Sequence, residues 1–234
     1  MNNNLDFFTS NIEFYSSDYR DFSLRPWEKR IVELVSGENV LDVACGGGRI
    51  TIPLLHRGHN VTATDFVPEF EYKIRRHEKQ FKGEFKFVRA RIECLPLQDD
   101  TFDSVVCVNS IVYAEYYVWY RRAISEMVRV LKPGGKLYFT SWNALHPLWG
   151  SSILLNYVTR RRERFGEVTP FLSMDTRTRK GKVKMYVPSA SKIQKMCNSN
   201  EELVSRVYNS DEFLMKKGLL STFKPILVVA GVKK

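Results

Sequence analysis

A run of small residues that begins with a carboxylate is the part of the chain best suited to binding a ligand. It reads Asp42-Val43-Ala44-Cys45-Gly46-Gly47-Gly48. Apolar residues at 40–43 are typical of a buried strand, and helical patterning starts at Arg49. Glycines at a strand-to-helix turn let the backbone bend sharply and let a ligand approach it closely. The run therefore predicts a ligand-binding loop.

The residue types in this loop favour a cationic ligand over a pyrophosphate. The dinucleotide-binding spacing Gly-x-Gly-x-x-Gly fails, because Thr51 stands where the third glycine should be. The carboxylate of Asp42 would repel a pyrophosphate and attract a cation. S-adenosylmethionine carries a sulfonium and an ammonium group, so the loop suits this cofactor electrostatically.

A second carboxylate, Asp65, follows Gly46 by the spacing of about 20 residues that is typical of a ribose-binding acid. It ends the apolar segment 60–64, and from a strand end it can hydrogen-bond both ribose hydroxyls. The alternative is that Asp65 caps the following helix. The strand end, the spacing and the loop together favour the ribose role.

Short apolar segments alternate with helical patterning along the chain, which predicts a parallel α/β sheet. The expected strands are residues 40–43, 60–64, 85–88, 102–108 and 136–140, with a last strand at 224–230. The expected helices are residues 49–55, 68–81, 123–131, 189–197 and 201–217, and Pro133-Gly134-Gly135 is expected to break the chain. In such a fold, ligands bind beyond the carboxyl ends of the strands.

Four segments, in order, resemble the motifs of the class I S-adenosylmethionine-dependent methyltransferases, of the methyltransferase type 11 kind. They are residues 40–48, 61–65, 95–106 and 126–135, within a resemblance that spans residues 38–142. The resemblance implies an α/β, Rossmann-like three-layer sandwich whose seven-stranded, mostly parallel sheet has its last strand antiparallel. It also implies one domain over residues 1–234. Its expected parts are an N-terminal helical and aromatic segment (1–37), the cofactor-binding core (38–142), and a substrate-side insertion with the C-terminal strands (143–234).

The resemblance implies that the matching positions hold S-adenosylmethionine. The glycine-rich loop would pass under the methionine part, Phe66 would pack beside the adenine, and residues after the strand at 102–108 would lie near the sulfonium. Arg91 stands where many members carry an aspartate that contacts the adenine amino group, and an arginine cannot accept that hydrogen bond. The expected cofactor-binding residues are Asp42, Ala44, Cys45, Gly46, Gly47, Gly48, Asp65, Phe66, Ile92, Glu93, Asn109, Ser110, Tyr15 and Tyr19.

Residues for acceptor binding and proton transfer are less well marked. In family members the N-terminal aromatic segment often folds over the cofactor, and Tyr15 and Tyr19 fit either that role or core packing. His146, Tyr113 and Glu115 are weak candidates for a general base, and an ordinary structural role is favoured for each. The segment 144–188 is basic and is expected to wall the substrate pocket or to be a solvated loop.

Composition bounds the remaining possibilities. The 234 residues carry a net charge of +10, which suits an anionic partner or a basic surface that only aids solubility. The four cysteines and four histidines lie in no ligand-like spacing, so no metal site is predicted. No apolar run reaches the roughly 18–20 residues of a membrane span, and the N-terminus lacks signal-peptide features, so we expect a cytoplasmic protein.

These observations lead to a ranked expectation of function. The first choice is methyl transfer to an oxygen, nitrogen or carbon nucleophile of a small-molecule metabolite. The second is a tRNA base methyltransferase, which the basic charge and a loose similarity over residues 121–142 support. A non-catalytic protein that binds S-adenosylmethionine and a nicotinamide-dependent oxidoreductase are the further alternatives.

Overall fold

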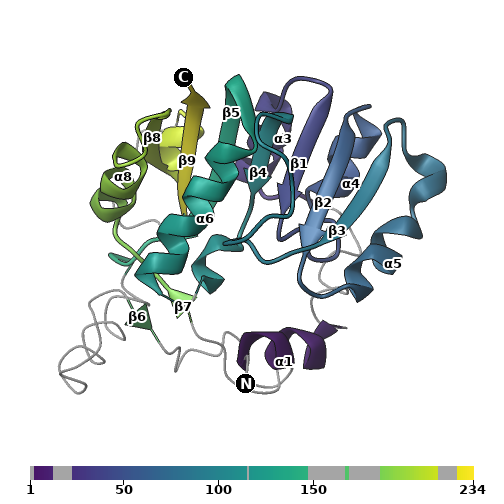
Figure 1. The fold of residues 1–234 in the computed structure, drawn as a ribbon, viewed down its shortest axis with the longest axis horizontal. Helices are drawn as coiled ribbons and strands as arrows, with labels where there is room; N and C mark the ends of the chain where they lie inside the picture. Colours follow the sequence, from purple (N-terminus) through teal and green to yellow (C-terminus); the bar gives the residue numbers. More distant parts are fainter. Residues whose placement is uncertain (1–2, 13–22, 115, 147–166, 169–184, 216–225) are drawn as a thin grey trace.

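The computed structural model describes residues 3–12, 23–114, 116–146, 167–168, 185–215 and 226–234. Its body is a seven-stranded sheet in the order β3-β2-β1-β4-β5-β9-β8 (Figure 1). The strands are β1 (Asn39–Val43), β2 (Asn60–Asp65), β3 (Phe85–Arg89), β4 (Phe102–Cys107), β5 (Leu131–Trp142), β8 (Leu203–Asn209) and β9 (Ile226–Lys233). The first five strands are parallel, and β9 lies antiparallel between β5 and β8. The predicted fold class, with its antiparallel last strand, is confirmed.

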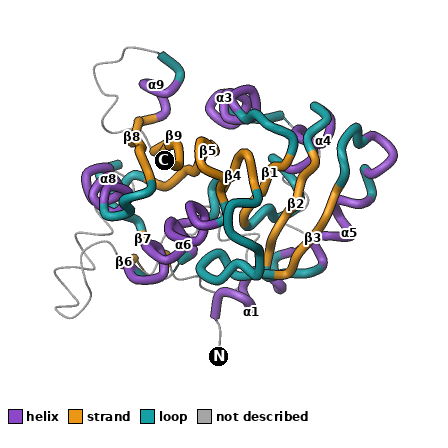
Figure 2. Tube along the Cα trace, turned by 45° about the horizontal axis from the view of Figure 1, so that its top comes forward, coloured by secondary structure: helices purple, strands orange, loops and turns teal. Residues whose placement is uncertain are grey.

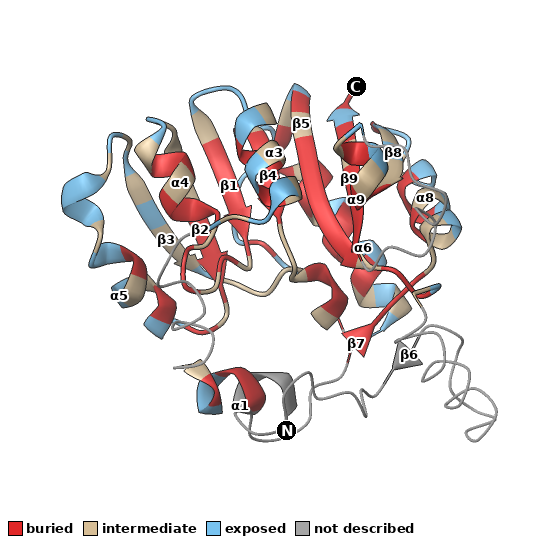
Figure 3. Ribbon diagram, turned by 180° about the vertical axis from the view of Figure 1, so that it is seen from behind, coloured by how far each residue is buried: buried red, intermediate tan, exposed pale blue. Residues whose placement is uncertain are grey.

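Helices cover both faces of the sheet, as Figure 2 shows. On one face, α3 (Pro26–Leu34) and α4 (Thr51–His56) pack apolar side chains against Val40, Val61 and Val106 of the sheet. On the other face, α6 (Tyr117–Arg129) and α8 (Ala190–Asn198) pack against alternate strand residues. The central strands are buried over most of their length (Figure 3), because both of their faces are covered.

Short elements lie at the edge of the sheet where the parallel strands finish (Figure 1). They include α1 (Asn3–Ser10), the 3₁₀ turn η2 (Ile111–Tyr113), and the two short strands β6 (Glu167–Val168) and β7 (Met185–Tyr186). Phe7 and Phe8 of α1 are buried against Val67 and Phe70, which lie just after β2 and in α5 (Glu69–Arg75). The aromatic N-terminal helix therefore covers part of the edge at which ligands bind in this architecture.

Three sequence predictions of local structure are wrong. A helix is expected over residues 201–217, but residues 203–209 form the strand β8 and are followed by the short helix α9 (Ser210–Phe213), because β8 pairs along its length with β9. The break expected at 133–135 lies inside β5, which begins at Leu131 with a register shift against β4. The helix expected over 68–81 is divided into α5 and the 3₁₀ turn η1 (Glu78–Gln80). Tertiary pairing overrides local propensity most clearly in β8.

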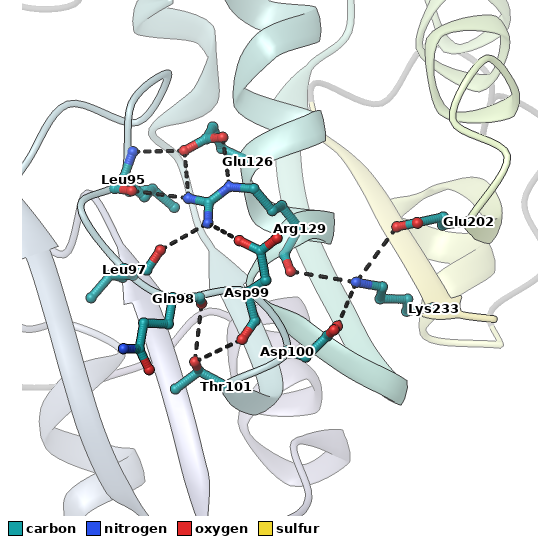
Figure 4. A network of polar contacts seen from close by, with 10 residues as sticks. All are labelled: Leu95, Leu97, Gln98, Asp99, Asp100, Thr101, Glu126, Arg129, Glu202 and Lys233. Carbon is teal, nitrogen blue, oxygen red and sulfur yellow. Dashed lines mark hydrogen bonds and ion pairs between the residues drawn. The ribbon is translucent and has the colours of Figure 1, made fainter.

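One arginine of α6 fixes the long connection between β3 and β4 (Figure 4). The guanidinium of Arg129 donates two hydrogen bonds to the Glu126 carboxylate, at 2.9 and 2.8 Å. It also donates to the carbonyls of Leu95 and Leu97, at 2.9 and 2.8 Å, and to Asp99. Since Glu126 accepts the Leu95 backbone N–H as well, this connection is held at several points by a single turn of helix.

Arg129→Lys is expected to lower the free energy of unfolding by about 1–2 kcal/mol, because one ammonium cannot satisfy acceptors arranged around a planar guanidinium. Urea unfolding measures the change. The matched control is Arg30→Lys, which alters a half-exposed pair with Glu33 at 3.7 Å and should stay within about 0.5 kcal/mol of the parent. Equal losses of unfolding free energy in the two variants would show that the hydrogen bonds of the Arg129 guanidinium do not stabilise the protein.

Candidate functional site

The glycine-rich loop leaves β1 in an unusual backbone conformation. Ala44 and Gly46 have φ values of 55° and 52°, and Gly48 has a φ of 90°. An alanine in the left-handed region costs on the order of 1 kcal/mol, so Ala44 is accommodated at the family's glycine position with some strain. The loop is tied to the neighbouring strand by the Cys45 N–H, which donates to the Thr64 carbonyl at 2.9 Å.

Gly46 and Gly48 have different surroundings. A Cβ atom built on Gly46 would meet nothing within 4 Å, whereas one on Gly48 would lie 2.7 Å from Cγ1 of Ile74 in α5. Gly48 therefore permits close packing of α5, and Gly46 borders open space at the strand ends. Cys45 and Gly47 are buried, and Cys45 packs with Ile52 and Ile74 rather than facing a ligand.

Asp65 ends β2 and binds the glycine-rich loop. Its Oδ2 accepts the Gly46 N–H at 3.0 Å, and its Oδ1 accepts the Val67 N–H at 3.0 Å. Helix α5 starts at Glu69 with Pro68 at its N-cap, so Asp65 does not cap that helix. Each carboxylate oxygen can accept a second hydrogen bond, which leaves room for two hydroxyl donors.

Asp42 and Asp65 are 2% and 5% exposed, and neither forms an ion pair within the part of the chain that the structure describes. The Asp42 carboxylate accepts a hydrogen bond from the Thr51 hydroxyl at 2.6 Å. Burial raises the pKa of Asp42 to about 7, and the Thr51 hydrogen bond only partly offsets this; the nearby Asp65 carboxylate raises it further. Burial likewise raises the pKa of Asp65 to about 6. Two desolvated carboxylates would be stabilised in their charged forms by a bound cation.

The segment after β4 lies directly against the glycine-rich loop. The Ser110 hydroxyl donates to the Ala44 carbonyl at 3.0 Å, so the two predicted sites meet as expected. Asn109 has a φ of 60°, and its N–H donates to the Thr140 hydroxyl oxygen at 2.7 Å. Its side-chain amide donates to Oε1 of Glu28 at 2.8 Å and so points toward α3.

Glu28 was missed by the sequence reasoning. It lies in the first turn of α3 and is fully buried. It shares a helical face with the buried residues Ile31, Val32 and Val35, at spacings of three, four and seven residues. A carboxylate on an otherwise apolar helix face is the signal that could have identified it, because a buried charge requires partners.

The residues expected near the adenine are placed as follows. The Phe66 ring meets the Phe8 ring edge to face at 5.6 Å between centroids. Glu93 is buried and forms an ion pair with Arg91, whose guanidinium lies 5.4 Å from the centre of the Trp119 ring. Ile92 packs against the core. Arg91 is thus neutralised, and the adenine roles of Phe66, Ile92 and Glu93 stay predictions.

The weak catalytic candidates are only partly described. Tyr113 lies in η2, with its ring 4.8 Å from that of Phe8, and His146 follows β5 with its N–H bonded to the Asn143 carbonyl at 3.0 Å. Tyr15, Tyr19 and Glu115 lie outside the described residues. In the described part of the chain, no three His, Cys, Asp or Glu residues are grouped as metal ligands. No described helix is long and apolar enough to cross a bilayer.

The fold is Rossmann-like, and comparison with known proteins shows which family the chain resembles. Residues 41–139 match the family described as "Methyltransferase domain". The chain is 20% identical to a solved S-adenosylmethionine-dependent methyltransferase of Methanosarcina mazei, with a TM-score of 0.68 over 90% of this chain and 98% of that one. Residues 41–139 therefore resemble a methyltransferase domain, as the motifs predict, and the solved methyltransferase shares the fold of this chain.

Curated relatives resemble only part of the chain. An uncharacterised protein of Mycobacterium tuberculosis is 34% identical over 106 residues, which is 45% of this chain and 38% of that protein. A demethylmenaquinone methyltransferase of Renibacterium salmoninarum is 31% identical over 129 residues, which is 54% of this chain and 51% of that enzyme. The chain thus matches about half or less of the length of these relatives.

Gly46→Ala is expected to weaken binding of S-adenosylhomocysteine at least about tenfold, because the added methyl group projects into the open space beside the loop. Its φ is nearly that of Ala44, where the chain already accepts an alanine, so the fold should survive. Gly48→Ala is the matched comparison and should mainly lower the thermal unfolding midpoint, since its methyl group collides with Ile74. Calorimetric titration and thermal melts measure both. Tight binding by Gly46→Ala would contradict a ligand position above this residue.

The raised pKa values predict an unusual pH dependence of stability. Carboxyl groups in the unfolded chain titrate near pH 4, whereas Asp42 and Asp65 titrate at about 7 and 6 in the folded protein. Between these values the folded protein holds more protons, so these two groups lower the free energy of unfolding as the pH rises from about 4 to 7. Asp42→Asn retains an acceptor for Thr51 and should be more stable than the parent by about 1–3 kcal/mol at pH 8, with little difference at pH 4.

Urea unfolding at both pH values tests this expectation. Asp103→Asn is the control, and its effect on stability at pH 8 should have the opposite sign. Partial burial raises the pKa of Asp103, but hydrogen bonds from Lys132 and from backbone N–H groups outweigh this and leave it lowered. That substitution should therefore destabilise the protein more at pH 8 than at low pH. A loss of stability at pH 8 in Asp42→Asn would contradict a desolvated Asp42.

Proposed function

We propose that the chain is an S-adenosylmethionine-dependent methyltransferase that moves a methyl group to an oxygen, nitrogen or carbon nucleophile of a small molecule. The observation that carries the proposal is the pair of buried carboxylates, Asp42 and Asp65, at the ends of adjacent strands beside the open space at Gly46. This arrangement suits a ligand that is both cationic and a nucleoside. A diphosphate, as in a nicotinamide cofactor, would meet two like charges there.

The residues of the crevice have separate tasks in this proposal. Asp65 accepts the ribose hydroxyls while it holds the Gly46 N–H, and Asp42 supplies negative potential beneath the methionine part. Phe66 packs beside the adenine, with Ile92 and Glu93 at its edge. S-adenosylmethionine supplies an electrophilic methyl group on its sulfonium. The protein aligns the acceptor with that methyl group and keeps water out.

An apolar cluster lies at the carboxyl edge of the sheet, where the acceptor would bind. Phe7 and Phe8 of α1 and Tyr113 of η2 cluster there. The relatives named demethylmenaquinone methyltransferases, at 31% and 35% identity, support a small organic acceptor. Tyr113, His146 and Glu115 are the candidates for a general base, which the reaction needs only when the nucleophile arrives protonated.

An RNA base is the second candidate acceptor. The net charge of +10 favours it, because lysine and arginine side chains neutralise phosphates. Aromatic rings with cations over them also lie near the start of α6, where the Lys192 ammonium is 5.3 Å from the Tyr117 ring centre. Such pairs occur on many protein surfaces, so the small-molecule acceptor stays the first choice.

Calorimetric titration is expected to show binding of S-adenosylhomocysteine and none of oxidised nicotinamide dinucleotide. Asp65→Ala should weaken the binding about tenfold or more, because hydrogen bonds to a charged group are worth about 1.5–3 kcal/mol. Glu71→Ala, which removes a partly exposed carboxylate from α5, is the matched control and should bind normally. Binding of the dinucleotide alone, or unchanged affinity in Asp65→Ala, would contradict the assignment.

Incubation of the protein with methyl-labelled S-adenosylmethionine and a cell extract identifies the acceptor class. We expect the label in the small-molecule fraction, and markedly less of it at low cofactor concentration with the Gly46→Ala variant as the control. Label in the RNA fraction would move the assignment to the second candidate. Label in neither fraction nor in protein would contradict catalysis.

A further inference from the structure

The buried carboxylate of Glu28 joins three parts of the chain. Its Oε2 accepts hydrogen bonds from Nε and Nη2 of Arg49, at 2.9 and 2.7 Å, and from the Arg25 N–H at 2.8 Å. Its Oε1 accepts the Asn109 side-chain amide at 2.8 Å. Glu28 is 0% exposed, and the side chain of Arg49 is only 14% exposed. The bonds between Glu28 and Arg49 are therefore made largely out of water, where charged hydrogen bonds are strong and their loss is costly.

Two loops border the proposed cofactor crevice, the glycine-rich loop and the loop after β4. Glu28 holds one residue at each of them. Arg49 comes directly after the glycine-rich loop of β1, and Asn109 comes just after β4. Strands β1 and β4 are adjacent and parallel, so both loops leave the sheet at the same edge. The structure thus connects the two loops through α3, by a carboxylate that lies behind the crevice.

Asn109 has the more demanding geometry of the two. Its backbone lies in the left-handed region with a φ of 60°, which asparagine tolerates better than most residues but which still needs support. The bond to Glu28 and the bond from its own N–H to Thr140 hold it from opposite ends. If Glu28 is removed, the hydrogen bond from Ser110 to the Ala44 carbonyl is the link between the β4 loop and the glycine-rich loop that remains among the described residues.

We infer that Glu28 is a positioning residue that sets the separation of the glycine-rich loop and the β4 loop, and thereby the affinity for S-adenosylmethionine. This inference rests on the proposed function, because it requires the crevice to bind that cofactor. Glu28 itself touches neither reactant. It acts through Arg49 and Asn109, which it holds at the ends of β1 and β4.

A purely structural role for Glu28 is the competing explanation, and Asp103 provides the matched control. The Asp103 carboxylate also joins separate segments, accepting the Glu38 and Asn39 N–H groups at 3.0 and 2.8 Å and the Lys132 ammonium at 2.7 Å. It lies at the starts of β1 and β4, the opposite end of the sheet from the crevice. A structural role predicts that both acids affect only stability.

The experiment compares Glu28→Gln with Asp103→Asn by calorimetric titration of S-adenosylhomocysteine and by thermal unfolding. Both variants should lower the unfolding midpoint. Glu28→Gln should also raise the dissociation constant about tenfold, the equivalent of one lost hydrogen bond, whereas Asp103→Asn should leave it within about twofold. Should Glu28→Gln fail to fold, Glu28→Asp, which keeps the charge but has a shorter reach, is evaluated in the same way.

A reciprocal double substitution supplies the rescue. In Glu28→Gln with Asn109→Asp, the new amide at position 28 can donate to the new carboxylate at position 109, while the remaining oxygen still accepts from Arg49. Aspartate also tolerates the left-handed backbone. Asn109→Asp alone measures any direct effect of position 109 on the cofactor. We expect the double variant to bind several-fold more tightly than either Glu28→Gln or Asn109→Asp, because the bond is restored with its polarity reversed.

The outcomes distinguish failure of the proposed function from failure of the positioning role of Glu28. Absence of binding by the parent protein would overturn the proposed function. Binding by the parent together with equal dissociation constants for Glu28→Gln and Asp103→Asn would overturn the positioning role alone. Failure of the double variant to regain affinity, while it folds, would also overturn the role, because the Glu28–Asn109 bond would then not transmit the effect.

Discussion

Two carboxylates held out of water at neighbouring strand ends are the constraint on which the rest of this structure depends. Burial raises the proton affinity of both carboxylates, Asp65 raises that of Asp42 further, and the described protein around them supplies hydrogen-bond donors but no cation. Such an arrangement lowers the free energy of unfolding at neutral pH, and a bound positive ligand would offset this loss. In the proposed function a sulfonium nucleoside supplies that positive charge, and the remaining structure holds the two carboxylates in place until it binds.

The support comes from short polar links between loops that leave adjacent strands. Asp65 binds the Gly46 N–H, Ser110 binds the Ala44 carbonyl, and Glu28 binds both Arg49 and Asn109. Each link crosses from one strand end to the next, so the loops are fixed relative to each other as well as to the sheet. The strained backbone at Ala44 and Asn109 is tolerated within this network.

The opposite end of the sheet and the long connection after β3 are fixed by other acids and bases. Asp103 with Lys132 closes the starts of the central strands, and Arg129 with Glu126 holds the β3–β4 connection against α6. These groups have ordinary ion-pair partners, unlike Asp42 and Asp65. Acids of the scaffold are thus paired with basic side chains, whereas the two acids of the candidate site are not paired with any described basic side chain.

The sequence by itself determined the five parallel strands, the glycine-rich loop and the two acids, because each depends on local periodicity or on spacing within a single strand-loop-helix unit. The antiparallel last strand followed from the family resemblance. Only the tertiary structure decided that residues 203–209 form a strand, since their pairing partner β9 lies far along the chain. It also decided the partners of Glu28 and of Phe8. Glu28 and Asn109 are 81 residues apart, and no local pattern encodes a contact that arises when the ends of two parallel strands are brought to one edge of the sheet.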